Sequence, residues 1–317
     1  MTAYLVRRFA QFPVVLLLVT LFLFVIMRAI PGDPVYAMMG EPEESFDREA
    51  LAAMREDLGL DQPLPVQYVD WLADLARGDL GSSFLYRQPV HEQLIDRVPV
   101  TAQVGLLSVG LAVLIGIPCG TIAAVKRNSP IDMLVTVVAM FGIAVPNFWF
   151  ALLLIWVFVV WLGMLPATGF TAVWENPVDA FRTMAMPVTA LGLTLSAAVM
   201  RHTRSSVLDV LHQDHVRTAR AKGLPGGLVV TRHTLRNALL PVVTIIGVQL
   251  GTVLAGSIVI ESIFALPGLG RLTIEAINGR DYPMVQGVVL LFTFMVLLVN
   301  LLTDLSYAIL DPRIRYG

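Results

Sequence analysis

Charged residues are scarce in this chain of 317 residues. Only 15% of the residues are Asp, Glu, Lys or Arg, and 56% are hydrophobic, whereas about 25% charged residues is usual for a soluble domain. This imbalance excludes an ordinary soluble protein and indicates residence in a lipid bilayer. The formal net charge of -2 gives no reason to expect a nucleic-acid partner.

The sequence contains a single cysteine and no phosphate-binding loop. The one cysteine, Cys119, excludes an intrachain disulfide framework and a cysteine-rich metal cluster, and it reads as a small packing residue in an apolar run. No Gly-x-x-x-x-Gly-Lys-Ser/Thr sequence occurs. The glycine-rich stretch at residues 221–227, Ala-Lys-Gly-Leu-Pro-Gly-Gly, has the wrong order and spacing to bind phosphates in this way. We therefore expect no catalytic residue, bound cofactor or metal in this chain, and we expect ATP to be bound elsewhere.

What the sequence does contain is long uncharged runs, and a transmembrane helix needs about 20 apolar residues. Six runs without Asp, Glu, Lys or Arg are long enough: 9–27, 98–125, 133–174, 183–200, 237–260 and 282–303. The sequence therefore predicts an all-α membrane protein with six transmembrane helices. The run 133–174 is long enough to be two spans hinged at Pro146-Asn147, so the count depends on the orientation of the loops.

Charge asymmetry between loops sets that orientation, because short cytoplasmic loops collect Lys and Arg. Residues 201–236 hold seven basic against two acidic residues, whereas residues 31–97 hold five against fourteen. The first segment is therefore predicted to be cytoplasmic and the second to lie outside. Two spans within 133–174 would turn the basic loop outward, so we predict one long helix there, ending near 162–166, with both termini in the cytoplasm.

The chain then divides into a first span with a short cytoplasmic N-terminus (1–30), an extracytoplasmic insertion (31–97) and a five-helix core (98–317). The insertion is too long for a structureless connection. Two helices are predicted in it, at about 47–58 and 66–77, each followed by a glycine. It is either a docking surface for a soluble partner or a cap over the transmembrane helices.

The cytoplasmic loop has the pattern of a short helix, a hinge and a second amphipathic helix that leads into the fifth span. Gly223 suits a left-handed helix end, and Pro225 prevents continuation. On a single helix one face would be shared by Leu208, Leu211, His215, Thr218 and Ala219. The basic residues Arg217, Arg220 and Lys222 spread over the remaining surface, and such a unit could move as a rigid knob.

Three interpretations of this loop compete. A basic amphipathic helix can lie on anionic lipid headgroups, but this does not explain the small residues Ala219, Ala221 and Gly223, which suit close approach by another protein. A metal site is the third interpretation, without support from a carboxylate or thiol cluster. Its ligands would be His202, His212, His215 and His233.

Three charged residues lie close to the predicted spans: Arg28, Glu261 and Asp304. All three are at span ends, where an interfacial group reaching water or a neighbour is the simplest explanation. Charges within spans are costly and for that reason are functional candidates. Glu261 is the best candidate because the fifth span before it contains Gly247, Gly251 and Gly256, which allow close helix packing. Our hypothesis is that Glu261 holds an outer gate or a subunit contact.

Two stretches of the cytoplasmic loop carry a family resemblance. Residues 214–223, Asp-His-Val-Arg-Thr-Ala-Arg-Ala-Lys-Gly, with Arg-Asn-Ala-Leu-Leu-Pro at 236–241, resemble the EAA loop of binding-protein-dependent ABC importer permeases of the dipeptide, oligopeptide and nickel family. The sequence departs from the family at His215, where Tyr is usual, and has Thr218-Ala-Arg220 in place of Glu-Ala-Ala. Further matching stretches lie at 31–34, 58–63, 78–82, 261–270 and 280–283.

The resemblance implies a type I ABC importer permease fold in a bacterial inner membrane. It implies a homologous second permease, most simply as a heterodimer, two cytoplasmic ATPases that use ATP and Mg, and an extracytoplasmic solute-binding protein. Peptides are the implied solute, with nickel chelates or glutathione as alternatives. ATPase coupling would be carried by Asp214, His215, Arg217, Thr218, Ala219, Arg220, Ala221, Lys222 and Gly223. The rival from another class is an ion-coupled secondary transporter, which predicts charged groups or broken helices at mid-membrane.

Overall fold

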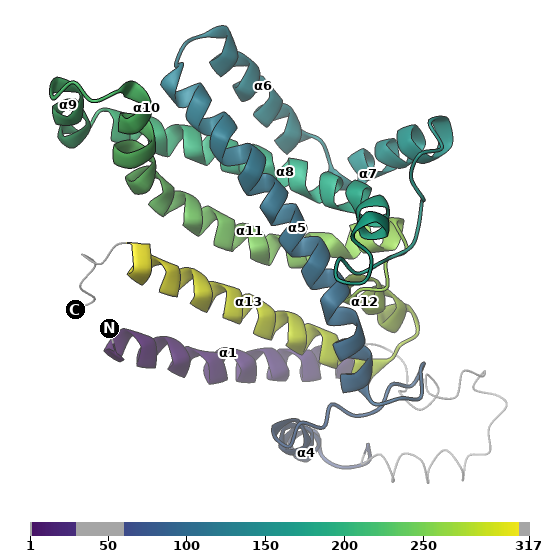
Figure 1. The fold of residues 1–317 in the computed structure, drawn as a ribbon. Helices are drawn as coiled ribbons and strands as arrows, with labels where there is room; N and C mark the ends of the chain where they lie inside the picture. The colour runs from purple at the N-terminus through teal and green to yellow at the C-terminus, as the bar shows by residue number, and fades with distance from the viewer. Residues whose placement is uncertain (1, 30–59, 311–317) are drawn as a thin grey trace. The chain divides into compact units, whose positions relative to one another are not determined.

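The computed structural model describes residues 2–29 and 60–310, and helices dominate this part of the chain (Figure 1). The N-terminal helix α1 spans Thr2–Ala29, and α4 spans Leu64–Ala76. Helix α4 confirms the helix predicted at 66–77, and Gly78 ends it with a left-handed φ of 84°. The helix predicted at about 47–58 lies outside the described residues.

The apolar runs after the insertion form long helices. Helix α5 spans Val90–Val125, and α8 spans Pro177–Leu211. Helix α8 begins at Asn176, whose side chain accepts hydrogen bonds from the main-chain N–H groups of Val178 and Asp179. Both helices extend beyond the uncharged runs that predicted them, because charged residues at a span end can reach water.

The prediction of one long helix within 133–174, ending near 162–166, is wrong, because the helix is broken in the middle. Helix α6 spans Pro130–Ala144, and α7 spans Asn147–Ile155 and continues as the π-helix η2, Trp156–Trp161. The two parts meet at 96°. Pro146 causes the break: Val145 before it is extended (φ -81°, ψ 122°), as a residue preceding proline prefers to be, and proline has no N–H for a helical hydrogen bond.

The C-terminal half contains a short helix in the basic loop 201–236 and three further helical segments. Helix α9 spans Asp214–Ala221, and α10 (Gly226–Leu228) runs through the π-helix η3 (Val229–Thr234) into α11 (Leu235–Ile263). Helix α12 spans Leu269–Asn278 and α13 spans Tyr282–Leu310. The predicted order of short helix, hinge and second helix leading into the fifth span is confirmed.

Among the described residues, five helices are long and apolar enough to cross a membrane. The bent pair α6 and α7 provides a sixth span if it crosses as one. The kink site proposed in the two-span alternative is therefore real, while the total agrees with the prediction of six.

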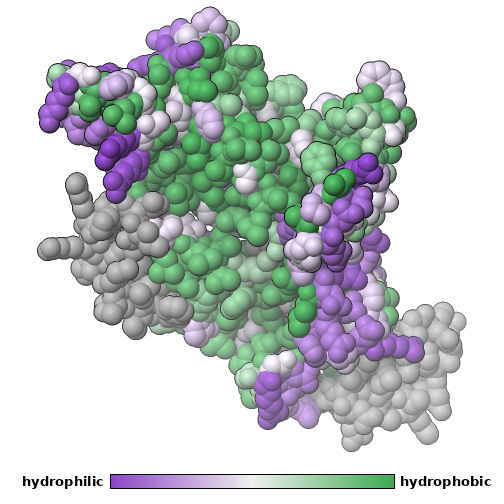
Figure 2. Space-filling model, in the orientation of Figure 1, coloured by the Kyte–Doolittle hydropathy of each residue, from purple (hydrophilic) through white to green (hydrophobic). Residues whose placement is uncertain are grey.

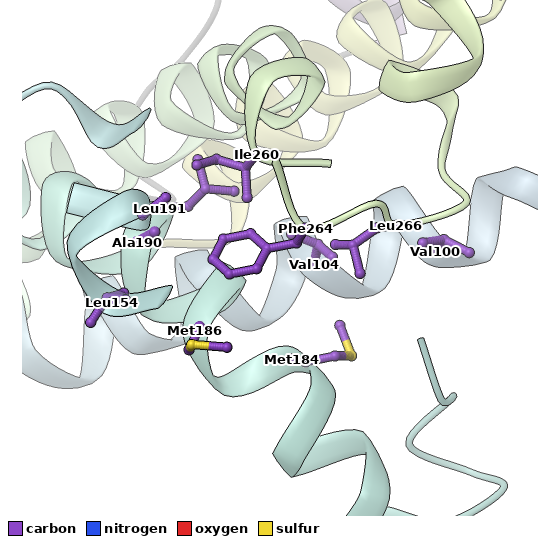
Figure 3. Close-up of a cluster of buried hydrophobic side chains, with 11 residues drawn as sticks. Val100, Val104, Leu154, Met184, Met186, Ala190, Leu191, Ile260, Phe264 and Leu266 are labelled. Atoms are coloured by element: carbon purple, nitrogen blue, oxygen red, sulfur yellow. The ribbon is translucent and has the colours of Figure 1, made fainter. Parts of the chain in front are cut away.

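The chain folds as two compact units: residues 1–99 with 271–297, and residues 100–270 with 298–317. The second unit has an apolar core built by α5, α7, α8 and the end of α11 (Figure 3). Phe264 projects from the turn after α11 among side chains of the other three helices. The buried members of this core are Val100, Val104, Ala151, Leu154, Met184, Met186, Ala190, Leu191, Ile260, Phe264 and Leu266.

Helices α5 and α8 approach closely at glycines. A Cβ at Gly120 would lie 2.5 Å from the carbonyl oxygen of Met200 and 2.8 Å from Cβ of Thr203. A Cβ at Gly247 of α11 would collide with Thr303 of α13, which confirms the packing role expected for that glycine. A Cβ added at Gly251 would meet nothing within 4 Å, so the described residues make no such close approach there.

We predict that Gly120→Ala destabilises the protein by about 1–3 kcal/mol, because the added methyl group has backbone of α8 in its way. The measurement is the thermal unfolding midpoint in detergent. Gly110→Ala is the matched control, since Gly110 is on the same helix with nothing within 4 Å. Equal midpoints for the two variants would contradict the close approach of α5 and α8.

Candidate coupling site and the buried carboxylates

Helix α9 is held by two small apolar side chains on one face. Val216 and Ala219 are buried, and they belong to a cluster with residues of α5, α8, η3 and α11. The other buried members of that cluster are Ala124, Val207, Val210, Val229 and Ala238. A helix of eight residues is too short to be stable alone, so this apolar seat holds it in place.

The opposite face of α9 is polar and open to solvent. Arg217 and Asp214 have side chains 77% and 99% exposed, and Arg220 and Lys222 are exposed as well. Figure 2 shows hydrophilic residues gathered at α9 and again at the turn between α5 and α6, where Lys126 and Arg127 are exposed. Basic groups therefore collect at this end of the second unit.

The hinge after α9 is glycine-rich and uncrowded. Gly223 adopts a left-handed φ of 73°, as predicted, and its N–H donates to the Arg220 carbonyl. A Cβ added at Gly223, Gly226 or Gly227 would meet nothing within 4 Å. This leaves open space next to the basic face, which a partner surface could approach.

His215 connects α9 to the beginning of α11. Its Nε2 atom lies 3.1 Å from the carbonyl oxygen of His233 and 3.2 Å from Nδ2 of Asn237. The tautomer decides which contact is the hydrogen bond: a protonated Nε2 donates to the carbonyl, and an unprotonated one accepts from the amide. Sequence reasoning treated this residue as a departure from the family pattern and missed the contact.

The prediction of one helical face shared by Leu208, Leu211, His215, Thr218 and Ala219 is wrong. Helix α8 ends at Leu211, and Gln213 is extended (φ -75°, ψ 152°), so the residues belong to two helices. His212 therefore does not face His215: its Nδ1 lies 2.7 Å from the Leu208 carbonyl oxygen. Among the described residues, no group of three or more His, Cys, Asp or Glu side chains is placed to hold a metal ion.

An ion pair that the sequence analysis missed joins α6 to α8. Arg204 donates from Nε to Asp132 Oδ1 at 2.6 Å and from its terminal nitrogen to Oδ2 at 2.8 Å, and the Asp132 carboxylate is buried. Ser129 accepts from the N–H of Asp132. The signal was present as Ser-Pro-Ile-Asp at 129–132, a helix start with Ser at the N-cap and an acid three residues later.

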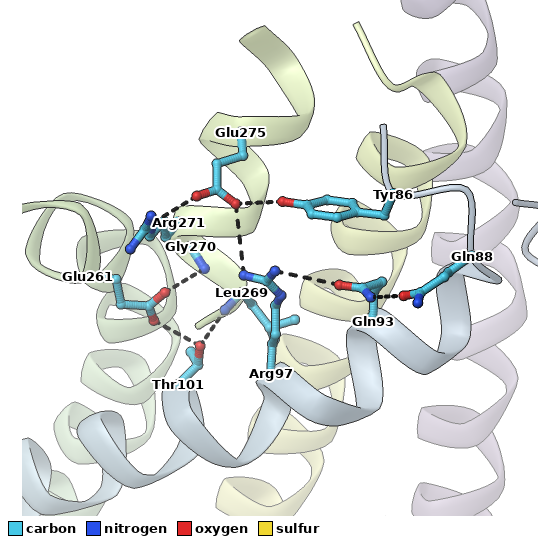
Figure 4. A network of polar contacts seen from close by, with 10 residues as sticks. All are labelled: Tyr86, Gln88, Gln93, Arg97, Thr101, Glu261, Leu269, Gly270, Arg271 and Glu275. Atoms are coloured by element: carbon cyan, nitrogen blue, oxygen red, sulfur yellow. Dashed lines mark hydrogen bonds and ion pairs between the residues drawn. The ribbon is translucent and has the colours of Figure 1, made fainter. Parts of the chain in front are cut away.

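Glu261 is fully buried and serves as a hydrogen-bond acceptor within the second unit (Figure 4). Its Oε1 accepts from the hydroxyl of Thr101 at 2.8 Å, and its Oε2 accepts from the N–H of Gly270 at 2.7 Å. Thr101 in turn accepts from the N–H of Leu269 at 2.9 Å. Since Leu269 and Gly270 begin α12, the carboxylate and the hydroxyl together cap that helix.

Two glycines make room for the Glu261 carboxylate. An added Cβ at Gly268 or Gly270 would collide with it. Glu261 is thus enclosed by its own subunit and does not reach water. Arg28 agrees with the simpler explanation of an exposed group at a span end, and its guanidinium lies 5.4 Å from the Phe24 ring centre. Asp304 is half-buried.

A second polar cluster lies in the first unit around Glu275 (Figure 4). Its carboxylate accepts from the Tyr86 hydroxyl and from Arg271 Nε, each at 2.7 Å, with Arg97 at 3.9 Å. Burial raises the pKa of Glu275, but hydrogen bonds from Tyr86 and Arg271 and the two positive charges outweigh it and lower the pKa. The pKa of Tyr86 is raised, mainly because the phenol is partly buried and also because it donates a hydrogen bond to Glu275.

Comparison with known sequences identifies the family of this chain. The family described as the binding-protein-dependent transport system inner membrane component matches residues 116–316, and the N-terminal region of such components matches residues 1–105. The chain belongs to this family. This permease is 41% identical over 316 residues to a putative peptide transport system permease of Brucella suis, with both chains fully covered.

Two further comparisons agree with the family. The dipeptide transport system permease DppB of Escherichia coli K12 is 43% identical over 321 residues, covering 94% of each chain. An inward-facing structure of the MetNI methionine ABC transporter matches in fold, with a TM-score of 0.59 and 18% identity over 70% of this chain and 97% of the other. The predicted type I ABC importer permease fold is therefore confirmed.

The family match also decides between the two transporter classes. The break between α6 and α7 is a feature that a secondary transporter would share, so geometry alone does not separate them. Membership in a binding-protein-dependent family does, and this permease is an integral inner-membrane component of an ABC importer.

We predict that Glu261→Gln lowers the thermal unfolding midpoint, with a cost of about 1–3 kcal/mol for the buried partner left unsatisfied. If the amide oxygen accepts from Gly270, its NH2 group faces Thr101, whose hydroxyl then has no acceptor. Glu175→Gln, at an exposed acid, is the control. An unchanged midpoint would refute the capping role, and unchanged transport with unchanged ATPase coupling would refute the gate hypothesis.

We predict that the Tyr86–Glu275 contact stabilises the protein most between about pH 4.5 and 10, the ordinary pKa values of the two groups. The contribution of Glu275, whose pKa is lowered, disappears as pH falls through its folded pKa. That of Tyr86, whose pKa is raised, disappears as pH rises through its folded pKa. The measurement is the midpoint difference between the natural protein and Tyr86→Phe against pH; a difference independent of pH would contradict it.

Proposed function

We propose that this permease is the non-catalytic translocation subunit of an ATP-driven peptide importer. Its partners would be a homologous second permease, two cytoplasmic ATPases that bind ATP and Mg, and an extracytoplasmic solute-binding protein. Peptides are supported by the names of relatives that are 41–43% identical across nearly the whole chain. Solute selection would then rest largely with the binding protein.

The observation that carries this proposal is the two-faced structure of α9. One face is seated by Val216 and Ala219, and the other presents Arg217, Arg220 and Lys222 to solvent. A soluble ATPase has access to the second face without disturbing the first. We propose that Asp214 to Gly223 form the ATPase contact, with the glycine hinge allowing close approach.

Movement of α9 would reach the membrane by two routes. The apolar seat links α9 to α8, which is 35 residues long, and His215 links it to the start of α11. Arg204 and Asp132 extend the first route to α6. A displacement of the knob would therefore be shared by several helices of the second unit.

The charges support an inside position for α9 and both termini. The exposed basic residues of α9 and of the turn at Lys126 and Arg127 would lie in the cytoplasm, in agreement with the bias for Lys and Arg in inside loops. A role of Glu261 in an outer gate stays a prediction, whereas its complete burial within this subunit argues against a direct contact with a second one.

We predict that Arg217→Glu combined with Arg220→Glu abolishes transport and the stimulation of ATPase activity by loaded binding protein. The reason is that four units of charge change on the exposed face, without removal of either buried side chain. Co-purification of the ATPases and solute-stimulated ATP hydrolysis in reconstituted vesicles are the measurements.

Arg182→Glu is the control, because Arg182 is also exposed and lies near the opposite end of α8. Reversal of charge there should leave coupling unchanged. If the α9 double variant assembles and couples like the natural protein, α9 is not the ATPase contact. If Arg182→Glu has the same effect, the loss reflects charge reversal in general.

A further inference from the structure

Helix α4 contacts α1 far from the end of the transmembrane helix. The Tyr68 hydroxyl lies 3.0 Å from Oγ1 of Thr20 and 3.4 Å from the Leu17 carbonyl oxygen. The Tyr68 and Trp71 rings pack on Phe24, with ring centres 5.4 and 6.3 Å away. These contacts fix the depth of α4 along α1.

The contact of the Tyr68 hydroxyl with Thr20 lies well inside the apolar span of α1. The apolar span of α1 runs from Ala10 to Ala29, and Thr20 lies nine residues before its end. At a rise of 1.5 Å per residue this is about 14 Å, roughly half of a hydrocarbon core that is about 30 Å thick. The distance to the nearer membrane surface is the same whichever terminus faces the cytoplasm.

The two edges of α4 differ in polarity, as expected for a helix with water on one side and hydrocarbon on the other. Gln67, Asp70 and Asp74 line a cavity of about 420 Å³ together with Met27 and Arg28 of α1. Met27 and Arg28 are closer to the end of α1 than Thr20, so the polar edge of α4 faces the water side. Val69 lies 100° around the helix from Asp70 and is 60% exposed.

Both helices have exposed apolar side chains, those of α1 on the side away from its contact with α4. Val66 is 43% exposed, and Leu18 and Phe22 of α1 are 62% and 64% exposed. In water such side chains on a short helix would be unfavourable, but at hydrocarbon depth they match their surroundings. A helix also satisfies its own main chain there, apart from its ends.

We propose that α4 is an in-plane helix embedded in one half of the bilayer, with Val66 and Val69 in contact with lipid acyl chains and its acidic edge facing water. It thus resembles an interfacial helix that is anchored to a transmembrane helix by Tyr68 and Trp71. This goes beyond the proposed transport function and does not depend on it. It also differs from both roles considered for the insertion, since the surface of α4 is covered by lipid.

The test uses spin labels on the full chain, purified with its partner subunits and reconstituted in lipid nanodiscs. Cys119 is replaced by Ser, and single cysteines are placed at Val69 and at Asp70. Collisions with O2, which concentrates in hydrocarbon, and with a water-soluble nickel chelate are measured at each label. We expect Val69→Cys to collide more with O2 and less with the chelate than Asp70→Cys does.

Leu18→Cys is the reference for a lipid-facing position on α1, and Ala73→Cys is a second label on the apolar side of α4. Collision of the Val69 label with the chelate at the rate of the Asp70 label would overturn the proposal, because α4 would then lie in water. Protection of Val69 and Ala73 from both reagents, with Leu18 still open to O2, would also overturn it, because protein would cover the helix. Unfolding midpoints verify that each labelled protein is folded.

Discussion

The hydrocarbon core of a bilayer offers no hydrogen-bond partner to the main chain, and each group left unsatisfied there costs several kcal/mol. Continuous helices meet this constraint without assistance, but every helix end near the membrane needs another donor or acceptor. In this permease side chains supply them. Asn176 caps α8, Ser129 caps α6, and Glu261 with Thr101 caps α12. Glu261, the buried acid that was considered as a transport candidate, therefore has the observed contacts of a residue that caps the beginning of a helix.

The same constraint explains what the sequence could predict and what it could not. Uncharged runs locate spans because charge is costly in lipid, so the positions of the five long helices were predictable. The left-handed Gly223 was predictable because few other residues adopt that conformation. A hinge at Pro146-Asn147 was considered as part of a two-span alternative and rejected, since the loop charges bear on the number of crossings and say nothing about the shape of one crossing.

For the candidate site, the sequence singled out a segment but did not reveal the contacts of its residues. Local sequence identified residues 214–223, whereas the partners of His215 are 18 and 22 residues away. Asp132 and Arg204 are 72 residues apart, and each alone reads as an ordinary charge at a loop. Contacts of this kind depend on how helices pack, and packing of α5 on α8 is decided by missing side chains at Gly116 and Gly120. Periodicity does not reveal which glycine meets which helix.

A short helix at the end of a long one transmits movement only if its attachment is stiffer than its contact with the partner. Two different kinds of contact attach α9 to the second unit. Apolar burial of Val216 and Ala219 is non-directional and tolerates small rotations, whereas the bond of His215 to the His233 carbonyl or the Asn237 amide is directional and resists them. Because both attachments end on helices of the second unit, a rotation of α9 has to turn these helices or break the contact at His215. In the proposed coupling role, the exposed arginines would contact the ATPase, and the buried face would pass the movement of α9 to the neighbouring helices.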